Sequence, residues 1–194
     1  MTEQLAAIIW AVGLVAWVVI RIPHQLRARK IGVAADRRSL SDRLALGASG
    51  VGLAVIPLIY VATGFPEAAD YAFQPWMGWL GALVMAAFLA LFYASHKQLG
   101  RNWSVTLEIR KDHKLVTDGL YRFVRHPMYS SFWLWALAQF LLLPNWVAGP
   151  AGLIGVALLY FSRVGKEEAM MRATFGQSYD DYAARTGRVV PKVF

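Results

Sequence analysis

The sequence predicts an all-α integral membrane protein with five transmembrane helices. Hydrophobic residues make up 57% of the 194 residues and charged residues only 16%, against about 25% charged in a typical soluble domain. The apolar residues gather in long runs, and all 20 Lys and Arg residues lie between or after those runs. The five runs span residues 5–20, 44–62, 76–95, 129–143 and 146–162.

Each run approaches the roughly 20 residues that a helix needs to cross a bilayer. The first run predicts a retained helix rather than a signal peptide, because only Glu3 is charged before it and a basic leading region is missing. Pro127 precedes the fourth run and pre-sets a first helical turn there. The short turn 144–150 joins the fourth and fifth runs, which predicts a tight hairpin.

The basic residues predict the orientation of the chain. Seven Lys and Arg residues lie in 21–43, seven in 97–125 and six in 163–192, whereas the N-terminal tail and residues 63–75 and 144–150 have none. Five helices place the three basic segments on one side, so the positive-inside rule predicts an outside N-terminus and a cytoplasmic C-terminus. The net charge of +8 is then explained by topology and anionic lipid, and no nucleic-acid partner is predicted.

We expect one membrane domain, residues 1–194, in a multi-pass protein of the cell membrane. Three helices fill residues 1–95, and residues 96–194 hold the last hairpin and both longer cytoplasmic segments. Each of those segments has about 30 residues, which is too few for a core of its own. They are therefore predicted to pack on each other and on the helix ends, so that a pocket between them lies at the cytoplasmic membrane interface.

Two polar clusters flank the last hairpin and are predicted to meet at that interface. The first is the segment Gly119-Leu-Tyr-Arg-Phe-Val-Arg-His-Pro-Met-Tyr129, and the second is Arg163-Val-Gly-Lys-Glu-Glu168. Arg163 and Glu167 are four residues apart and share one face of a helix. The N-terminus of the fourth helix adds free N–H groups that attract an anion. The sequence leaves open whether Arg122, Arg125 and Glu168 contact a ligand or lipid headgroups.

Several other classes of site have no support in the sequence. The chain has no Cys, so disulfides, thiolate metal sites and a Cys nucleophile are excluded within it. Its four His residues show no metal-ligand spacing, and we predict no metal. Neither the dinucleotide fingerprint nor the phosphate-binding loop occurs, and the two serines at 130 and 131 lack the elbow motif of serine hydrolases.

The second half of the chain resembles the isoprenylcysteine carboxyl methyltransferase family of integral membrane methyltransferases, in a small prokaryotic form. The resemblance rests on an ordered pattern: Gly119-x-Tyr121, Arg125-His-Pro-x-Tyr129, a hairpin, Arg163-x-x-x-Glu167-Glu168, and Phe175-Gly-x-x-Tyr179. It covers roughly residues 97–194. The N-terminal half is similar only in being apolar helices.

The resemblance implies S-adenosylmethionine as the methyl donor and S-adenosylhomocysteine as its product. It implies that Arg163 serves as the catalytic residue at the substrate carboxylate. The implied cofactor contacts are Glu108, His113, Lys114, Leu115, Val116, Tyr121, His126, Pro127, Met128, Tyr129 and Glu167. Of these, Glu108 fits the family spacing least well.

The activity that the resemblance implies is carboxyl methylation of a prenylated cysteine, with a lipidic substrate in the membrane. Phospholipid N-methylation is the nearest alternative, because related membrane enzymes share the hairpin and the pair of glutamates. A sterol-type reductase that uses NADPH shares the Arg-His-Pro motif but is usually much longer. A non-enzymatic membrane scaffold is the remaining alternative. The sequence determines neither the natural methyl acceptor nor the oligomeric state.

Overall fold

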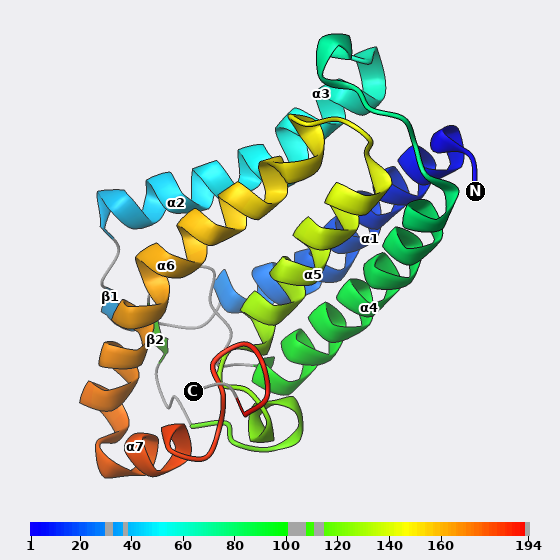
Figure 1. Ribbon diagram of the computed structural model, residues 1–194. Helices are drawn as coiled ribbons and strands as arrows, with labels where there is room; N and C mark the ends of the chain where they lie inside the picture. The colour runs from blue at the N-terminus through cyan, green and yellow to red at the C-terminus, as the bar shows by residue number, and fades with distance from the viewer. Residues whose placement is uncertain (30–32, 37–38, 101–107, 111–114, 193–194) are drawn as a thin grey trace.

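The chain forms a bundle of long helices with a small polar assembly at one end (Figure 1). The computed structural model describes residues 1–29, 33–36, 39–100, 108–110 and 115–192. The long helices are α1 (Glu3–Arg29), α2 (Leu40–Gly50), α3 (Ile56–Thr63), α4 (Pro75–Leu99), α5 (Pro127–Leu142) and α6 (Ala148–Phe175). The shorter elements are the π-helical segment η1 (Val51–Val55), the 3-10 turns η2 (Glu67–Ala69) and η4 (Gly119–Arg122), helix α7 (Gln177–Ala183), and strands β1 (Val33–Asp36) and β2 (Glu108–Arg110).

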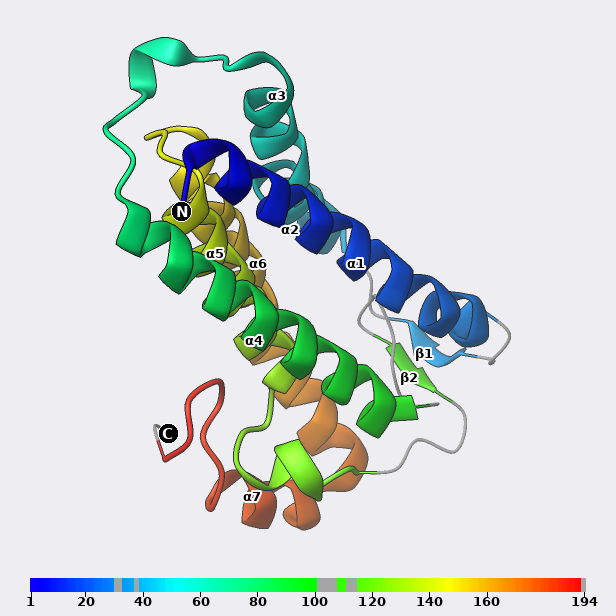
Figure 2. The same ribbon diagram turned by 90° about the vertical axis from the view of Figure 1, so that its right-hand side faces the viewer.

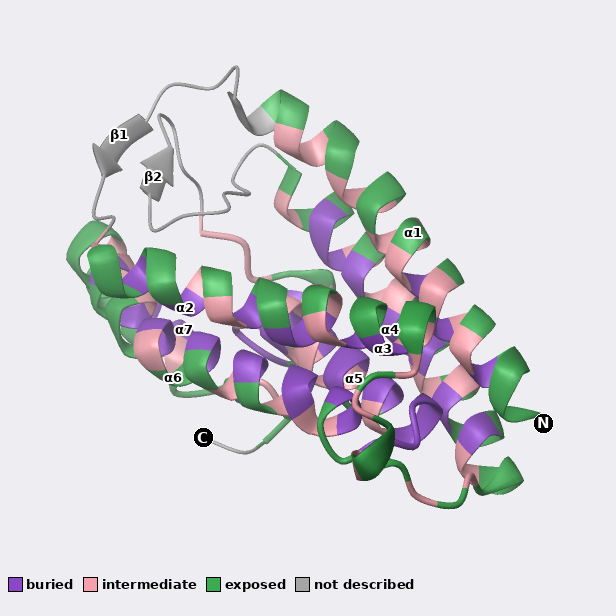
Figure 3. Cartoon of the chain, turned by 90° about the horizontal axis from the view of Figure 1, so that it is seen from above, coloured by how far each residue is buried: buried purple, intermediate pink, exposed green. Residues whose placement is uncertain are grey.

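Helix α5 lies in the centre of the bundle, with α4 on one side and α6 on the other. Helix α1 packs on α4, and α2 with η1 packs on α6 (Figure 2). The largest apolar core fills the space between α1, α4 and α5 and contains the fully buried rings of Trp10, Phe88, Phe92 and Trp135. The outward faces of α1 and α2 are exposed (Figure 3). The exposed residues of α1 include Ile8, Val12, Val15 and Val19, an apolar surface of the kind that lipid contact requires.

The all-helical, membrane-type fold is confirmed. Among the described residues, four helical spans are long and apolar enough to cross a membrane: Glu3–Arg27, Leu40–Thr63, Pro75–Leu99 and Ala148–Phe175. Helix α5 has 16 residues, which corresponds to about 24 Å of helix. It is shorter than those four, so the fifth crossing stays a prediction.

Asn145 stabilises one end of the bundle, where the chain turns from α5 into α6. Its Nδ2 donates to Pro66 O at 2.9 Å and to Asp70 Oδ1 at 2.7 Å. Its Oδ1 accepts from the N–H groups of Val147 and Ala148 at 2.9 and 2.8 Å. Because this buried amide uses both hydrogens and both lone pairs, it ties residues 66–70 to the start of α6.

Gln139 closes a gap in the hydrogen bonding of the second span. The N–H of Ile56 donates to Val51 O, as in a π-helix, and Pro57 has no N–H, so the carbonyl of Gly52 lacks its usual helical donor. Gln139 Nε2, from α5, donates to Gly52 O at 3.0 Å and also to Ala148 O at 2.7 Å. One buried amide therefore joins α5, the second span and α6.

Helix α1 and the two short strands differ from the sequence prediction. Helix α1 continues through Pro23 to Arg29, beyond the apolar run that ends at residue 20. Helix α6, by contrast, continues past its apolar run to Phe175, which places Arg163 and Glu167 on one helix as predicted. Strands β1 and β2 pair as a short antiparallel ladder, which the sequence did not predict.

Candidate functional site

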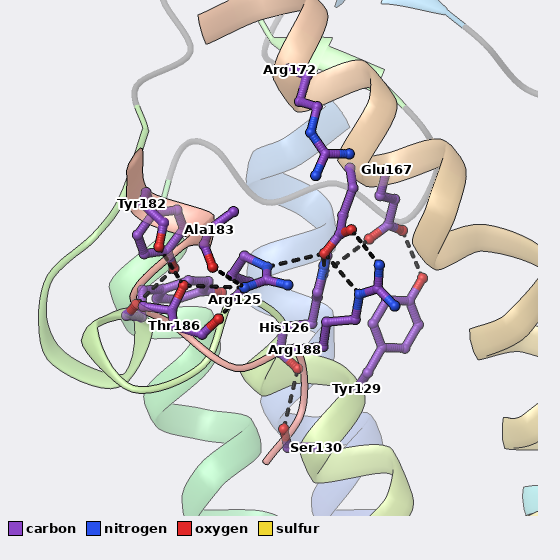
Figure 4. A network of polar contacts seen from close by, with 12 residues as sticks. Arg125, His126, Tyr129, Ser130, Glu167, Arg172, Tyr182, Ala183, Thr186 and Arg188 are labelled. Atoms are coloured by element: carbon purple, nitrogen blue, oxygen red, sulfur yellow. Dashed lines mark hydrogen bonds and ion pairs between the residues drawn. The ribbon is translucent and has the colours of Figure 1, made fainter. Parts of the chain in front are cut away.

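The predicted polar clusters meet at the end of the bundle that carries α7 and the C-terminal tail (Figure 1). The start of α5, the last four turns of α6, residues 115–126 and the tail 184–190 come together there (Figure 4). The loop 64–74 and the turn from α5 into α6 lie at the opposite end. The hydrophobic helices thus bring the two polar clusters together at the end of the bundle that carries α7.

Backbone hydrogen bonds fix the tail against the start of α5. The N–H of Arg125 donates to Gly187 O at 2.8 Å, and the N–H of His126 donates to Arg188 O at 2.9 Å. Ser130 Oγ donates to Val189 O at 2.6 Å. Helix α5 begins at Pro127, as the sequence predicts. The tail therefore closes one side of the charged site.

Glu168 is the centre of a buried ionic cluster. Its side chain is 2% exposed and contacts Arg125 Nε at 3.0 Å, Arg188 Nη2 at 2.9 Å and His126 Nε2 at 3.5 Å. Arg125 Nη1 also donates to the carbonyls of Ala183, at 2.8 Å, and Thr186. The hydrogen bond with Glu168 raises the pKa of Arg188 above its ordinary value. These contacts offset the cost of burying the charges and hold the loop, α6 and the tail together.

Glu167 occupies a different environment from its neighbour. Consecutive helical residues point about 100° apart, and Glu167 faces α5, where Tyr129 OH donates to its Oε1 at 2.7 Å. Arg163 Nη2 lies 3.5 Å from the same oxygen, and His126 Nδ1 lies 3.5 Å from Oε2. The Glu167 side chain is 22% exposed. Its carboxylate can thus accept further hydrogen bonds from a bound molecule.

Three buried tyrosines form a second cluster next to the charged one. Tyr121, Tyr179 and Tyr182 pack together, and Leu115 and Val116 pack against them. Tyr182 OH donates to Tyr121 O at 2.7 Å. Burial raises the pKa of Tyr121 well above its ordinary value and that of Tyr179 to about 12. These phenols therefore stay neutral and can donate hydrogen bonds.

The turn that carries Tyr121 is held by the last turn of α4. Gln98 Oε1 accepts from the N–H of Leu120 at 2.9 Å. Gly119 has a φ of +59°, and a Cβ at this position would collide with Gln98 Nε2. A glycine is favoured at this position both by its backbone conformation and by the close side chain. This explains physically why the turn into Tyr121 contains Gly119.

The predicted site residues fall into four groups. The structure brings His126, Tyr129, Arg163 and Glu167 together in one cluster. Tyr121, Leu115 and Val116 belong to the neighbouring aromatic cluster, whereas Pro127 begins α5 and the Met128 side chain packs against the apolar core. Glu108 lies in β2, where only its backbone is described, and His113 and Lys114 lie outside the described residues.

From the sequence alone, the roles of Arg125 and Glu168 stayed open and Arg188 was not a candidate. Their contacts join residues 43 positions apart, Arg125 and Glu168, and 20 positions apart, Glu168 and Arg188. No periodicity links a tail arginine to a helix glutamate at such distances. The one sequence signal for this cluster was the adjacent pair Glu167 and Glu168 in a basic segment.

Within the described ranges, no three His, Asp or Glu side chains gather as a metal site would require.

Known proteins are similar to this chain in sequence. A sequence model of the isoprenylcysteine carboxyl methyltransferase (ICMT) family matches residues 79–173, which include α5 and nearly all of α6. A protein-S-isoprenylcysteine O-methyltransferase of Schizosaccharomyces pombe is 34% identical over 116 residues, which cover 59% of this chain and 48% of the yeast protein. A probable enzyme of the same name from Oryza sativa subsp. indica is 30% identical over 129 residues, 66% of either chain.

A solved structure gives a similar result. The eukaryotic intramembrane Ras methyltransferase ICMT aligns with a TM-score of 0.55 and 26% identity, over 81% of this chain and 54% of that chain. The chain spans about half the length of the yeast protein and of this solved structure. The matching segment contains Arg125, His126, Tyr129, Arg163 and Glu167. The chain therefore belongs to the isoprenylcysteine carboxyl methyltransferase family.

Proposed function

We propose that the protein transfers a methyl group from S-adenosylmethionine to the carboxylate of a lipidic substrate, a prenylated cysteine. The observation that carries this proposal is the environment of Glu167. Its carboxylate is oriented by Tyr129 and flanked by Arg163 and His126, yet it remains partly exposed. The names of the family's curated members and of the solved relative supply the reaction class.

The residues fit the chemistry of the proposed methyl donor, which carries an ammonium group, a carboxylate and a ribose. The Glu167 carboxylate suits an ammonium or hydroxyl donor, because charge-assisted hydrogen bonds are the stronger ones. His126 belongs to the charged cluster and Tyr121 to the aromatic cluster, and both can contact the remaining groups of the methyl donor. When bound, S-adenosylmethionine supplies its sulfonium methyl group, and the acceptor oxygen takes that methyl as the carbon–sulfur bond breaks.

The contribution of the protein is then chiefly one of position. A substrate carboxylate is already ionised at neutral pH, so little acid–base help is needed. Alignment of the two reactants at about 3–3.5 Å is the main requirement. Arg163 is one turn of α6 before Glu167, and its guanidinium can hold a carboxylate with two parallel hydrogen bonds. We propose that Arg163 positions the substrate carboxylate and that Glu167 positions the methyl donor.

The proposed reaction takes place at the cytoplasmic face of the cell membrane, in a chain that crosses the membrane five times. Two features support this. Helix α5 runs from the Glu168 cluster at one end of the bundle to the hydrogen bonds of Asn145 at the other, so it extends over the whole length of the bundle. Both described basic regions that flank the last hairpin, around Arg125 and Arg188, lie at the end with the charged site.

The test uses the full chain in detergent or in phospholipid vesicles, with isotope-labelled S-adenosylmethionine. The acceptor is a farnesylated N-acetylcysteine, and its carboxamide derivative is the control. We expect label in a base-labile ester of the acid and none in the amide. Label in the amine headgroup of phosphatidylethanolamine vesicles, with the prenylated acid unchanged, would instead support phospholipid N-methylation and overturn the proposal.

A further inference from the structure

Two tyrosines of α7 are packed alike but bonded differently. Gly176, with a φ of +54°, turns the chain from α6 into α7, which then presents Tyr179 and Tyr182 one turn apart. Their ring centroids are 6.1 Å apart, and the residues are 2% and 3% exposed. Tyr182 OH donates to Tyr121 O. The buried hydroxyl of Tyr179 has no hydrogen-bond partner among the described residues.

A buried hydroxyl without a partner is unusual in a native protein, since nearly all such groups are satisfied. Packing alone does not require the oxygen, because a phenylalanine ring would fill the same space. An unsatisfied donor next to a candidate site is therefore informative. It leaves the hydroxyl available to a group that does not belong to the described residues.

The surroundings of Tyr179 place its hydroxyl at the boundary between the two clusters. Its ring belongs to the aromatic cluster, on which Leu115 and Val116 pack. After burial, the charges that affect the pKa of its phenol are those of Glu168, Arg125, Arg172 and Glu167. The Arg172 guanidinium lies 5.7 Å from the ring centroid. Burial keeps the phenol neutral by raising its pKa to about 12, so it is a hydrogen-bond donor at physiological pH.

We propose that Tyr179 is a further binding residue for the methyl donor. Its hydroxyl donates a hydrogen bond to an oxygen or nitrogen atom of that molecule. This inference rests on the proposed function. It adds α7 to the elements that form the pocket, which are otherwise α5, α6 and the loop before α5. It also gives the pair of α7 tyrosines separate roles: Tyr182 secures the loop, and Tyr179 contacts the ligand.

The experiment compares the wild-type protein with Tyr179→Phe and the matched control Tyr182→Phe. Calorimetric titration with S-adenosylhomocysteine gives the affinity, and thermal unfolding without ligand gives the stability. We expect Tyr179→Phe to bind about tenfold more weakly while its ligand-free Tm stays at the wild-type value. Tyr182→Phe should lower the ligand-free Tm, because it removes the bond to Tyr121 O.

Two results would overturn the inference while leaving the proposed function intact. One is wild-type affinity in Tyr179→Phe. The other is a fall in its ligand-free Tm as large as that of Tyr182→Phe, since the hydroxyl would then have a structural partner. Failure of the folded wild-type protein to bind S-adenosylhomocysteine would instead contradict the proposed function, and this inference with it.

Discussion

Tyr129 and Glu167 join the last two long helices by a hydrogen bond of 2.7 Å, donated by the phenol to Glu167 Oε1. Its neighbour Glu168 makes no such contact with α5 and instead binds Arg125 and Arg188 in the buried cluster. The two adjacent glutamates therefore have different environments. The Glu167 side chain is partly exposed, whereas the buried Glu168 joins the loop before α5, helix α6 and the tail.

Glu168→Gln tests whether the buried ionic cluster around Glu168 stabilises the protein. The substitution leaves the buried Arg125 without its counter-ion, and breaking a buried pair in this way costs about 3–5 kcal/mol. We expect a lower ligand-free Tm and earlier proteolysis of the tail after Arg185. Glu67→Gln, at an exposed position at the other end of the bundle, is the control. Equal Tm values for the two variants would show that the cluster adds no stability.

Arg163→Ala tests the placement of the acceptor. We expect the variant to bind S-adenosylhomocysteine close to normally and to methylate the prenylated acid much more slowly, because the guanidinium no longer orients the carboxylate. Titration and turnover must be measured on the same preparation. Parallel losses of binding and turnover would identify a structural arginine instead.

Gln139→Leu tests the junction of α5 with the π-helical segment. The variant keeps a similar side-chain volume but leaves the carbonyl of Gly52 without its donor, at a cost of about 1–3 kcal/mol. The Tm should fall, and the affinity for S-adenosylhomocysteine should not change, because Gln139 lies at the end of α5 away from the site. An unchanged Tm would mean that the Gly52 carbonyl is satisfied in another way.

Single-cysteine labelling tests the topology, and the absence of natural cysteines leaves no background. Ala68 lies in η2 and Ala184 follows α7, and both are exposed. The loop that contains η2 and helix α7 lie at opposite ends of the bundle (Figure 1). In intact cells, a membrane-impermeant maleimide should label Ala68→Cys and should label Ala184→Cys only after lysis. The reverse pattern would contradict the cytoplasmic placement of the site.

Most of the fold followed from hydropathy, because helices that face lipid need continuous apolar surface. The contact between Arg163 and Glu167 followed from their helical spacing, and the start of α5 followed from Pro127. Strands β1 and β2 have only four and three residues, too few for a periodic signal. The role of Arg188 was hidden because it depends on how the tail folds back over α5.

The most direct test of the central claim is titration of the purified protein with S-adenosylhomocysteine, alongside Glu167→Gln. The variant loses the charge of the carboxylate but keeps its shape, so a charge-assisted hydrogen bond to the ligand is weakened by about 1.5–3 kcal/mol. We predict measurable binding to the wild-type protein and at least about tenfold weaker binding to the variant. Equal affinities would contradict the assignment of Glu167, and a folded wild-type protein that binds no ligand would contradict the methyltransferase function.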